Sequence, residues 1–145
     1  MRRYIRYNKK FKSKSKYKKI DWKLDKDTKK RVVNLIDALN LKWLQKSRIF
    51  CFRSENANTR AIARIWGFSH IWQKALRQSP AYIIEVISER YDGLDDKEKD
   101  KVLLHEITHI PKNFSGSLMP HIRRGKRNFH DKVHELIIQY ERLNR

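Results

Sequence analysis

The apolar residues of this chain recur in patterns that predict helices and short strands. Between Asp21 or Asp25 and about Gln45, apolar side chains recur at spacings of three and four, which predicts a helix with one buried face. That face consists of Val32, Leu35, Ile36, Leu39 and Trp43. Residues 47–53 (SRIFCFR) are rich in β-branched and aromatic side chains, so we expect a short strand there and a turn at residues 55–58.

The middle of the chain predicts further strands. Residues 61–66 form a second candidate strand that Gly67 ends, whereas residues 70–76 suit either a strand or a helix. Residues 81–88 (AYIIEVIS) have the strongest strand pattern in the chain.

Two helices are expected in the last third of the chain. Asp95 and Glu98 are spaced as a capping box, which predicts a helix start, and Pro111 ends that helix because proline cannot continue it. After a loop over residues 112–128, a final helix is predicted over about residues 129–143. Its buried stripe consists of Val133, Leu136, Ile137 and Tyr140.

The charge of the chain is its most unusual bulk property. The 145 residues include 35 Lys and Arg but only 16 Asp and Glu, which gives a formal net charge of +19. Such an excess implies attraction to an anionic partner, most obviously a nucleic acid. The length fits one domain with a hydrophobic core.

Composition also excludes several classes of protein. No apolar run reaches the roughly 18 residues of a membrane span, and the basic N-terminus lacks the apolar core of a secretory signal. Cys51 is the only cysteine, so an internal disulfide is excluded and a reducing, cytoplasmic location is expected. Cys51 lies in an apolar run, where we expect a small buried side chain rather than a catalytic thiol.

The N-terminal residues predict a separate segment. Residues 1–19 contain ten Lys or Arg and no acid, and aromatic residues are interspersed among these charges. We therefore expect a flexible basic arm at residues 1–19 and a folded domain at residues 20–145. The arm suits phosphate and base contacts, although a solubilising tail is an equal alternative. The candidate nucleic-acid contacts are Arg2, Arg3, Lys9 and Lys10 in the arm, with Arg123 and Arg124 in the later loop.

The motif that carries the most chemistry is His-Glu-x-x-His at residues 105–109. On a helix, residues i and i+4 lie on one face, so His105 and His109 can share one zinc ion. In this motif the glutamate, here Glu106, is the general base that takes a proton from the activated water. The five-residue pattern is short, so the alternative is an amphipathic helix with two surface histidines. Five of the six histidines fall within residues 105–134, which favours a metal site.

A catalytic zinc site usually takes three protein ligands and leaves one position open. The metzincin extension is absent because Lys112 and Ser115 stand at its positions, and neither Glu135 nor Glu141 lies in a thermolysin-like motif. Histidine is therefore the expected third ligand. His121 follows Pro120 in a loop that can return to the metal, whereas His130 is in register with the buried stripe of the last helix. His121 is favoured over His130, and His134 lies slightly off that stripe.

The stretch from Tyr82 to about Tyr140 resembles the small zincin-like metallopeptidases of archaea and phages, which are related in plan to SprT-like proteases. The matching residues are the strand 82–86 and the motif 105–111, followed by a glycine-containing loop and a later histidine. The resemblance implies a minimal zincin domain, α+β, with a three-histidine zinc site. SprT-like members have His-Gly-x-x-Phe at the third ligand. Here His121 is followed by isoleucine and His130 by aspartate, so the third ligand stays open.

These features predict a zinc-dependent metallopeptidase that acts on a peptide or protein substrate. In zinc peptidases the sheet edge beside the motif helix pairs with an extended substrate, and the strand 81–88 just before the helix is the candidate here. The candidates for an additional electrophile are Tyr82, Tyr91, His134, Arg123 and Arg124, and Asp131 is a candidate to orient a ligand. Two alternatives are a nucleic-acid-binding protein with a structural metal on a zincin scaffold, and a basic helical protein without metal. Glu106 favours the peptidase, because a structural site does not need it.

Overall fold

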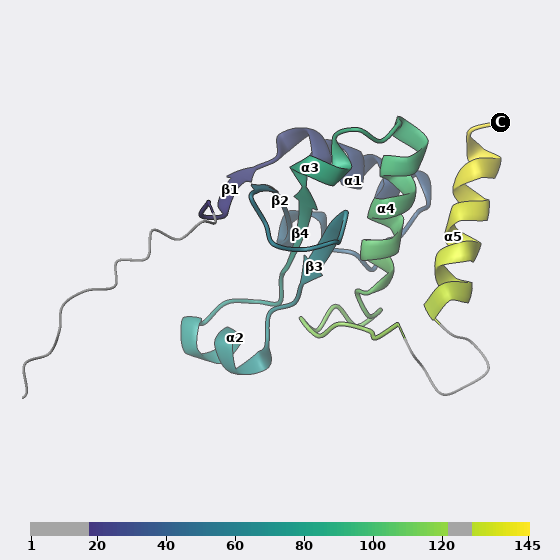
Figure 1. The fold of residues 1–145 in the computed structure, drawn as a ribbon. Helices are drawn as coiled ribbons and strands as arrows, with labels where there is room; N and C mark the ends of the chain where they lie inside the picture. Colours follow the sequence, from purple (N-terminus) through teal and green to yellow (C-terminus); the bar gives the residue numbers. More distant parts are fainter. Residues whose placement is uncertain (1–17, 122–128) are drawn as a thin grey trace, which may run out of the picture.

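The computed structural model describes residues 18–121 and 129–145, and it has the expected α+β architecture with a small mixed sheet (Figure 1). The strands are β1 (Asp21–Leu24), β2 (Ile49–Glu55), β3 (Ala63–Trp66) and β4 (Tyr82–Ile87). The helices are α1 (Lys26–Ala38), the short 3-10 helix η1 (Lys46–Arg48), α2 (His70–Leu76), α3 (Ser88–Tyr91), α4 (Asp96–Thr108) and α5 (Phe129–Leu143). No helix in these two ranges is long and apolar enough to cross a membrane.

The four strands form one sheet in the order β1-β2-β4-β3. β4 pairs in parallel with β2 and antiparallel with β3, so it lies inside the sheet. The expectation that the strand before the motif helix lies at the sheet edge is therefore wrong. The edge strand on that side is β3, which is connected to β4 through α2. It is β3 that contacts α4.

One face of the sheet is covered by α1 and α4, and α5 packs against the outer side of α4 (Figure 1). The hydrophobic core lies between the sheet and these helices. It includes Val32, Leu35, Ile36, Ile49, Cys51, Tyr82, Ile84, Val86, Leu103, Leu104 and Ile107. Cys51 is buried there as expected, and burial raises the pKa of its thiol to about 12, so it stays a neutral core side chain.

The first helix is shorter than its apolar pattern predicts. Residues 21–24 form β1, and α1 begins after Asp25, whose carboxylate caps the helix by accepting from the Thr28 backbone N–H at 2.9 Å. The helix ends at Ala38 because Asn40 adopts a left-handed conformation with φ of 53°. Trp43 still packs on the core, but from the turn that follows the helix.

The later elements follow the sequence closely. Residues 70–76, which suited either state, form the helix α2, and none of its side chains is buried. The capping box of α4 is present, since Asp95 and Glu98 each accept a hydrogen bond from the backbone of the other. α5 has the expected bounds.

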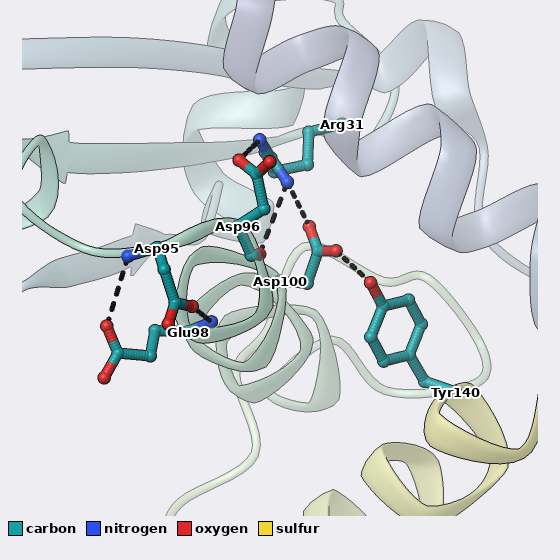
Figure 2. A network of polar contacts seen from close by, with 6 residues as sticks. All are labelled: Arg31, Asp95, Asp96, Glu98, Asp100 and Tyr140. Atoms are coloured by element: carbon teal, nitrogen blue, oxygen red, sulfur yellow. Dashed lines mark hydrogen bonds and ion pairs between the residues drawn. The ribbon is translucent and has the colours of Figure 1, made fainter. Parts of the chain in front are cut away.

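A polar network holds the first half of α4 against its neighbours (Figure 2). The Arg31 guanidinium of α1 contacts the carboxylates of Asp96 at 2.7 Å and Asp100 at 2.8 Å. The Tyr140 hydroxyl of α5 donates to the second oxygen of Asp100. These contacts join α1, α4 and α5 one turn before His105, so they fix the register of the motif helix.

Candidate metal centre

The motif histidines are placed by the packing of α4. Leu103, Leu104 and Ile107 are fully buried in the core, and this fixes the rotation of the helix. His105 and His109 lie on one side of the helix as the i, i+4 spacing requires, with ring centroids 5.3 Å apart. His105 is half-buried and His109 is buried.

The loop after α4 folds back on the motif. The backbone N–H of Met119 donates to the His109 carbonyl oxygen at 2.7 Å, and Nδ1 of His109 donates to the Met119 carbonyl oxygen at 2.5 Å. A carbonyl can only accept, so Nδ1 carries the proton and Nε2 of His109 keeps a free lone pair. This is the usual way in which a backbone carbonyl orients a metal-binding histidine.

The same turn brings His121 next to the two motif histidines. One side-chain nitrogen from each of His105, His109 and His121 lies within 4.8 Å of the others. The Nε2 atoms of His105 and His121 are 3.0 Å apart, and the ring centroids of His109 and His121 are 4.4 Å apart. Three imidazoles converging in this way are a donor set that suits Zn²⁺.

Tyr82 and two glycines hold this loop in place. The Tyr82 hydroxyl accepts from the Gly116 backbone N–H at 2.8 Å and donates to the Ser117 carbonyl oxygen at 2.8 Å. Gly116 has φ of 93°, which favours glycine, and a Cβ at Gly67 would lie 2.4 Å from the Gly116 carbonyl oxygen. Gln73 of α2 also donates to the Ser115 carbonyl oxygen at 2.9 Å. The loop is thus anchored to β4, α2 and the end of β3.

The electrostatics of the site favour uncharged histidines. Burial, together with the neighbouring imidazoles of His109, His121 and His130, lowers the pKa of His105 to about 4. Burial also lowers the pKa of His109, despite the hydrogen bond to Met119. Both rings are therefore neutral near pH 7, which is the form that binds a metal.

Glu106 lies between the histidines in sequence and is about as buried as His109. Only 8% of its surface is exposed, and burial raises the pKa of its carboxyl to about 7. A carboxylate with a pKa near the working pH is well suited to accept and release a proton.

Phe129 is a site residue that sequence reasoning missed. Its ring stacks on His109 with centroids 4.2 Å apart and an interplanar angle of 24°. It also lies 5.0 Å from the His105 ring and 4.9 Å from the His121 ring, measured between centroids. Phe129 stands four residues before buried Val133, so extending the stripe of the last helix by one turn would have found it.

The other candidate residues are not part of the cluster of three histidines. The His130 ring lies near it, with its centroid 6.4 Å from that of His121. The expectation that His130 points inward is wrong, because α5 turns Phe129 and Val133 to the core and leaves His130 exposed. His134 is exposed as well, and Tyr91 is buried in the core cluster. The basic candidates Arg2, Arg3, Lys9, Lys10, Arg123 and Arg124 lie outside the described residues.

Comparison with known proteins places this chain in a family. The profile of the family described as Putative phage metallopeptidase matches residues 20–139, which is most of the chain. The chain belongs to this family. No curated protein and no solved structure matched in the corresponding searches. Membership in the phage metallopeptidase family indicates a metallopeptidase that acts on a peptide or protein substrate, and such an enzyme implies a metal ion.

Proposed function

We propose that the protein is a zinc-dependent metallopeptidase in which His105, His109 and His121 hold the metal and Glu106 is the general base. The observation that carries this proposal is the convergence of three imidazoles, together with a buried carboxylate, Glu106, on the helix that carries His105. When bound, zinc would supply Lewis-acid chemistry by activating a water molecule and polarising the scissile carbonyl group.

In this proposal Glu106 moves the proton. Its carboxylate accepts a proton as the water oxygen attacks the carbonyl carbon, and it returns that proton to the amine as the C–N bond breaks. Met119 orients His109 through its carbonyl oxygen, and Phe129 excludes water from one side of the three imidazoles.

The donor set favours a catalytic over a structural metal. Structural zinc sites are closed by four protein ligands and commonly use cysteine. Cys51, the only cysteine in the chain, lies in the hydrophobic core and outside the histidine cluster. Three histidines therefore leave a position for water and substrate.

The substrate would bind along β3. This strand is the sheet edge that contacts α4, and among residues 18–121 and 129–145 it pairs with β4 on one side only. An extended peptide can add to such an edge through backbone hydrogen bonds, which places its chain beside the motif helix.

We also propose that the basic residues 1–19 recruit the enzyme to nucleic acid. Their ten Lys and Arg support this role, and they act through the phosphate backbone. Deleting residues 1–19 should flatten the dependence of oligonucleotide affinity on salt concentration. An unchanged salt dependence would contradict a role for the arm.

The peptidase proposal is tested with a library of unmodified peptides and mass spectrometry of the products. Zinc-loaded wild type should cleave library peptides, and Glu106→Gln should lose at least about a hundredfold in rate while keeping its zinc. Glu135→Gln, which changes an exposed glutamate of α5, is the matched control and should cleave normally. Equal cleavage by Glu106→Gln and wild type would contradict the assignment of the general base.

A further inference from the structure

The face of the sheet opposite α1 and α4 carries an exposed group of apolar side chains. We call it the aromatic face, and it consists of Trp22, Phe50, Phe52, Trp66 and Ile83. The strand register aligns Phe50, Ile83 and Trp66 in one row across β2, β4 and β3. Trp22 is 53% exposed and Trp66 46%, which is a large aromatic surface to leave in water.

A buried carboxylate fixes the two indoles of this face. Glu85 of β4 accepts from Nε1 of Trp22 at 2.9 Å and from Nε1 of Trp66 at 2.8 Å. Arg64 also donates to both oxygens of the same carboxylate. The polar edges of the indoles are thus satisfied inside the protein, and their rings are held in one orientation. Between them lies an almost wholly apolar hollow of about 390 Å³ floored by Phe52 and Ile83.

Cationic side chains accompany the exposed rings. The Arg64 guanidinium lies 5.0 Å from the ring centroid of Trp66, and that of Arg48 lies 5.9 Å from the ring centroid of Phe50. Arg48 donates to the carbonyl oxygens of Ser79 and Pro80, which hold it beside the face. Glu85 balances the charge of Arg64, whereas Arg48 bonds to neutral carbonyl groups, so Arg48 adds a positive charge to the stacking surface of Phe50.

We propose that the aromatic face binds single-stranded nucleic acid by stacking bases on Phe50, Trp66 and Trp22. Every base has a π-face, so fixed aromatic rings accept bases without regard to sequence, and Arg48 beside Phe50 can contact a phosphate. A second copy of the chain fits this face less well, because each copy has a net charge of +19 and the two would repel. The charge complementarity therefore favours a polyanion with exposed bases.

This surface is separate from the candidate metal centre. The histidines lie on the side of the sheet that the helices cover, because His105 and His109 belong to α4 and its end. The aromatic face is on the opposite side of the sheet. Nucleic acid and peptide could therefore bind at the same time. The basic residues 1–19 would supply charge, and the aromatic face would supply contacts to the bases.

The test compares two probes with the full 145-residue protein. One is a fluorescein-labelled oligothymidine, and the other is an abasic oligonucleotide of the same length and charge. In fluorescence anisotropy at elevated salt, wild type should bind the base-bearing strand about 10-fold or more tightly than the abasic strand. Equal affinities of wild type for the two strands would overturn the proposal, since charge alone would then explain binding.

Variants assign the preference to named side chains. Phe50→Thr and Trp66→Leu should each reduce the preference for bases by about 5-fold or more, whereas Trp66→Phe should keep most of it because a ring remains. Trp72→Leu, which removes an exposed tryptophan of α2, is the control and should bind as wild type does. A preference unchanged in Phe50→Thr and Trp66→Leu would overturn the proposal. So would a dimer in sedimentation velocity that Phe50→Thr abolishes, since the face would then join two copies.

Discussion

The hydroxyl of Tyr82 donates a hydrogen bond to the Ser117 carbonyl oxygen at 2.8 Å, and so links the central strand β4 to the loop that carries His121. The same oxygen accepts from the Gly116 backbone N–H. The strand was expected because of its apolar run, and its tyrosine was a candidate electrophile. In the structure that tyrosine instead holds the loop that completes the histidine cluster.

Replacing Tyr82 with phenylalanine should therefore weaken metal binding without unfolding the protein. The change leaves two loop backbone groups unpaired, at a cost of about 1–3 kcal/mol in the free energy of unfolding. Zinc affinity, measured by competition with a chromogenic chelator, should fall about 10- to 100-fold because His121 is less well placed. Tyr91→Phe, at a buried tyrosine of the core cluster, is the control. Equal zinc affinities of Tyr82→Phe and wild type would show that the hydroxyl does not position the site.

Gly67 provides a second test of the same loop. An alanine Cβ there would meet the Gly116 carbonyl oxygen at 2.4 Å, so the loop must move away from β3. We expect Gly67→Ala to lower the free energy of unfolding in urea by about 1–3 kcal/mol and to weaken zinc binding as well. Gly93→Ala is a matched control, because a Cβ at that position meets nothing within 4 Å. If Gly67→Ala and Gly93→Ala had similar free energies of unfolding and similar zinc affinities, the close approach of Gly67 to Gly116 would be contradicted.

Glu85 predicts a specific dependence of stability on pH. Burial alone would raise the pKa of this carboxyl, but hydrogen bonds from Arg64, Trp66 and Trp22 outweigh burial and lower it from 4.5 to about 2. A carboxyl whose pKa is lower in the folded state stabilises the protein above its unfolded pKa. That contribution is lost as pH falls from about 4.5 towards 2.

Glu85→Gln should therefore be less stable than wild type at pH 7, by on the order of 2 kcal/mol, and the difference should shrink between pH 4.5 and 2. Urea unfolding across this range measures both effects. Glu55→Gln, at an exposed glutamate that ends β2, should follow the wild-type curve. A constant difference between Glu85→Gln and wild type at all pH values would contradict the pKa shift.

Local signals in the sequence predicted much of the fold. The capping box of Asp95 and Glu98 depends on neighbours in sequence and is present. The predicted stripe of the last helix is buried at Val133 and only half-buried at Leu136, Ile137 and Tyr140. The early end of α1 depends on one residue in a left-handed conformation, Asn40, and the apolar pattern of the helix does not indicate that conformation. The order of the strands was not predictable either, since it depends on pairings between distant segments.

In the candidate site, too, the features that depend on neighbours in sequence were predicted and those that depend on distant contacts were not. His105 and His109 follow from helical spacing, and His121 was expected from a loop able to return to them. The loop anchors at Tyr82 and Gly67 arise from tertiary contacts, which the motif does not indicate. Phe129 could have been found by extending the stripe of the last helix, but its stacking on His109 could not. The pairing of Trp22 and Trp66 through Glu85 likewise joins residues on different strands.

The central claim is that His105, His109 and His121 hold one zinc ion, and zinc content per chain tests it most directly. We would purify four proteins without an affinity tag and reconstitute them with zinc: wild type, His105→Ala, His121→Ala and His130→Ala. Their zinc content would be measured by inductively coupled plasma mass spectrometry. We predict one zinc per chain in wild type and His130→Ala, with loss in His105→Ala and His121→Ala. Full zinc content in His121→Ala, or no zinc in reconstituted wild type, would contradict the proposed site.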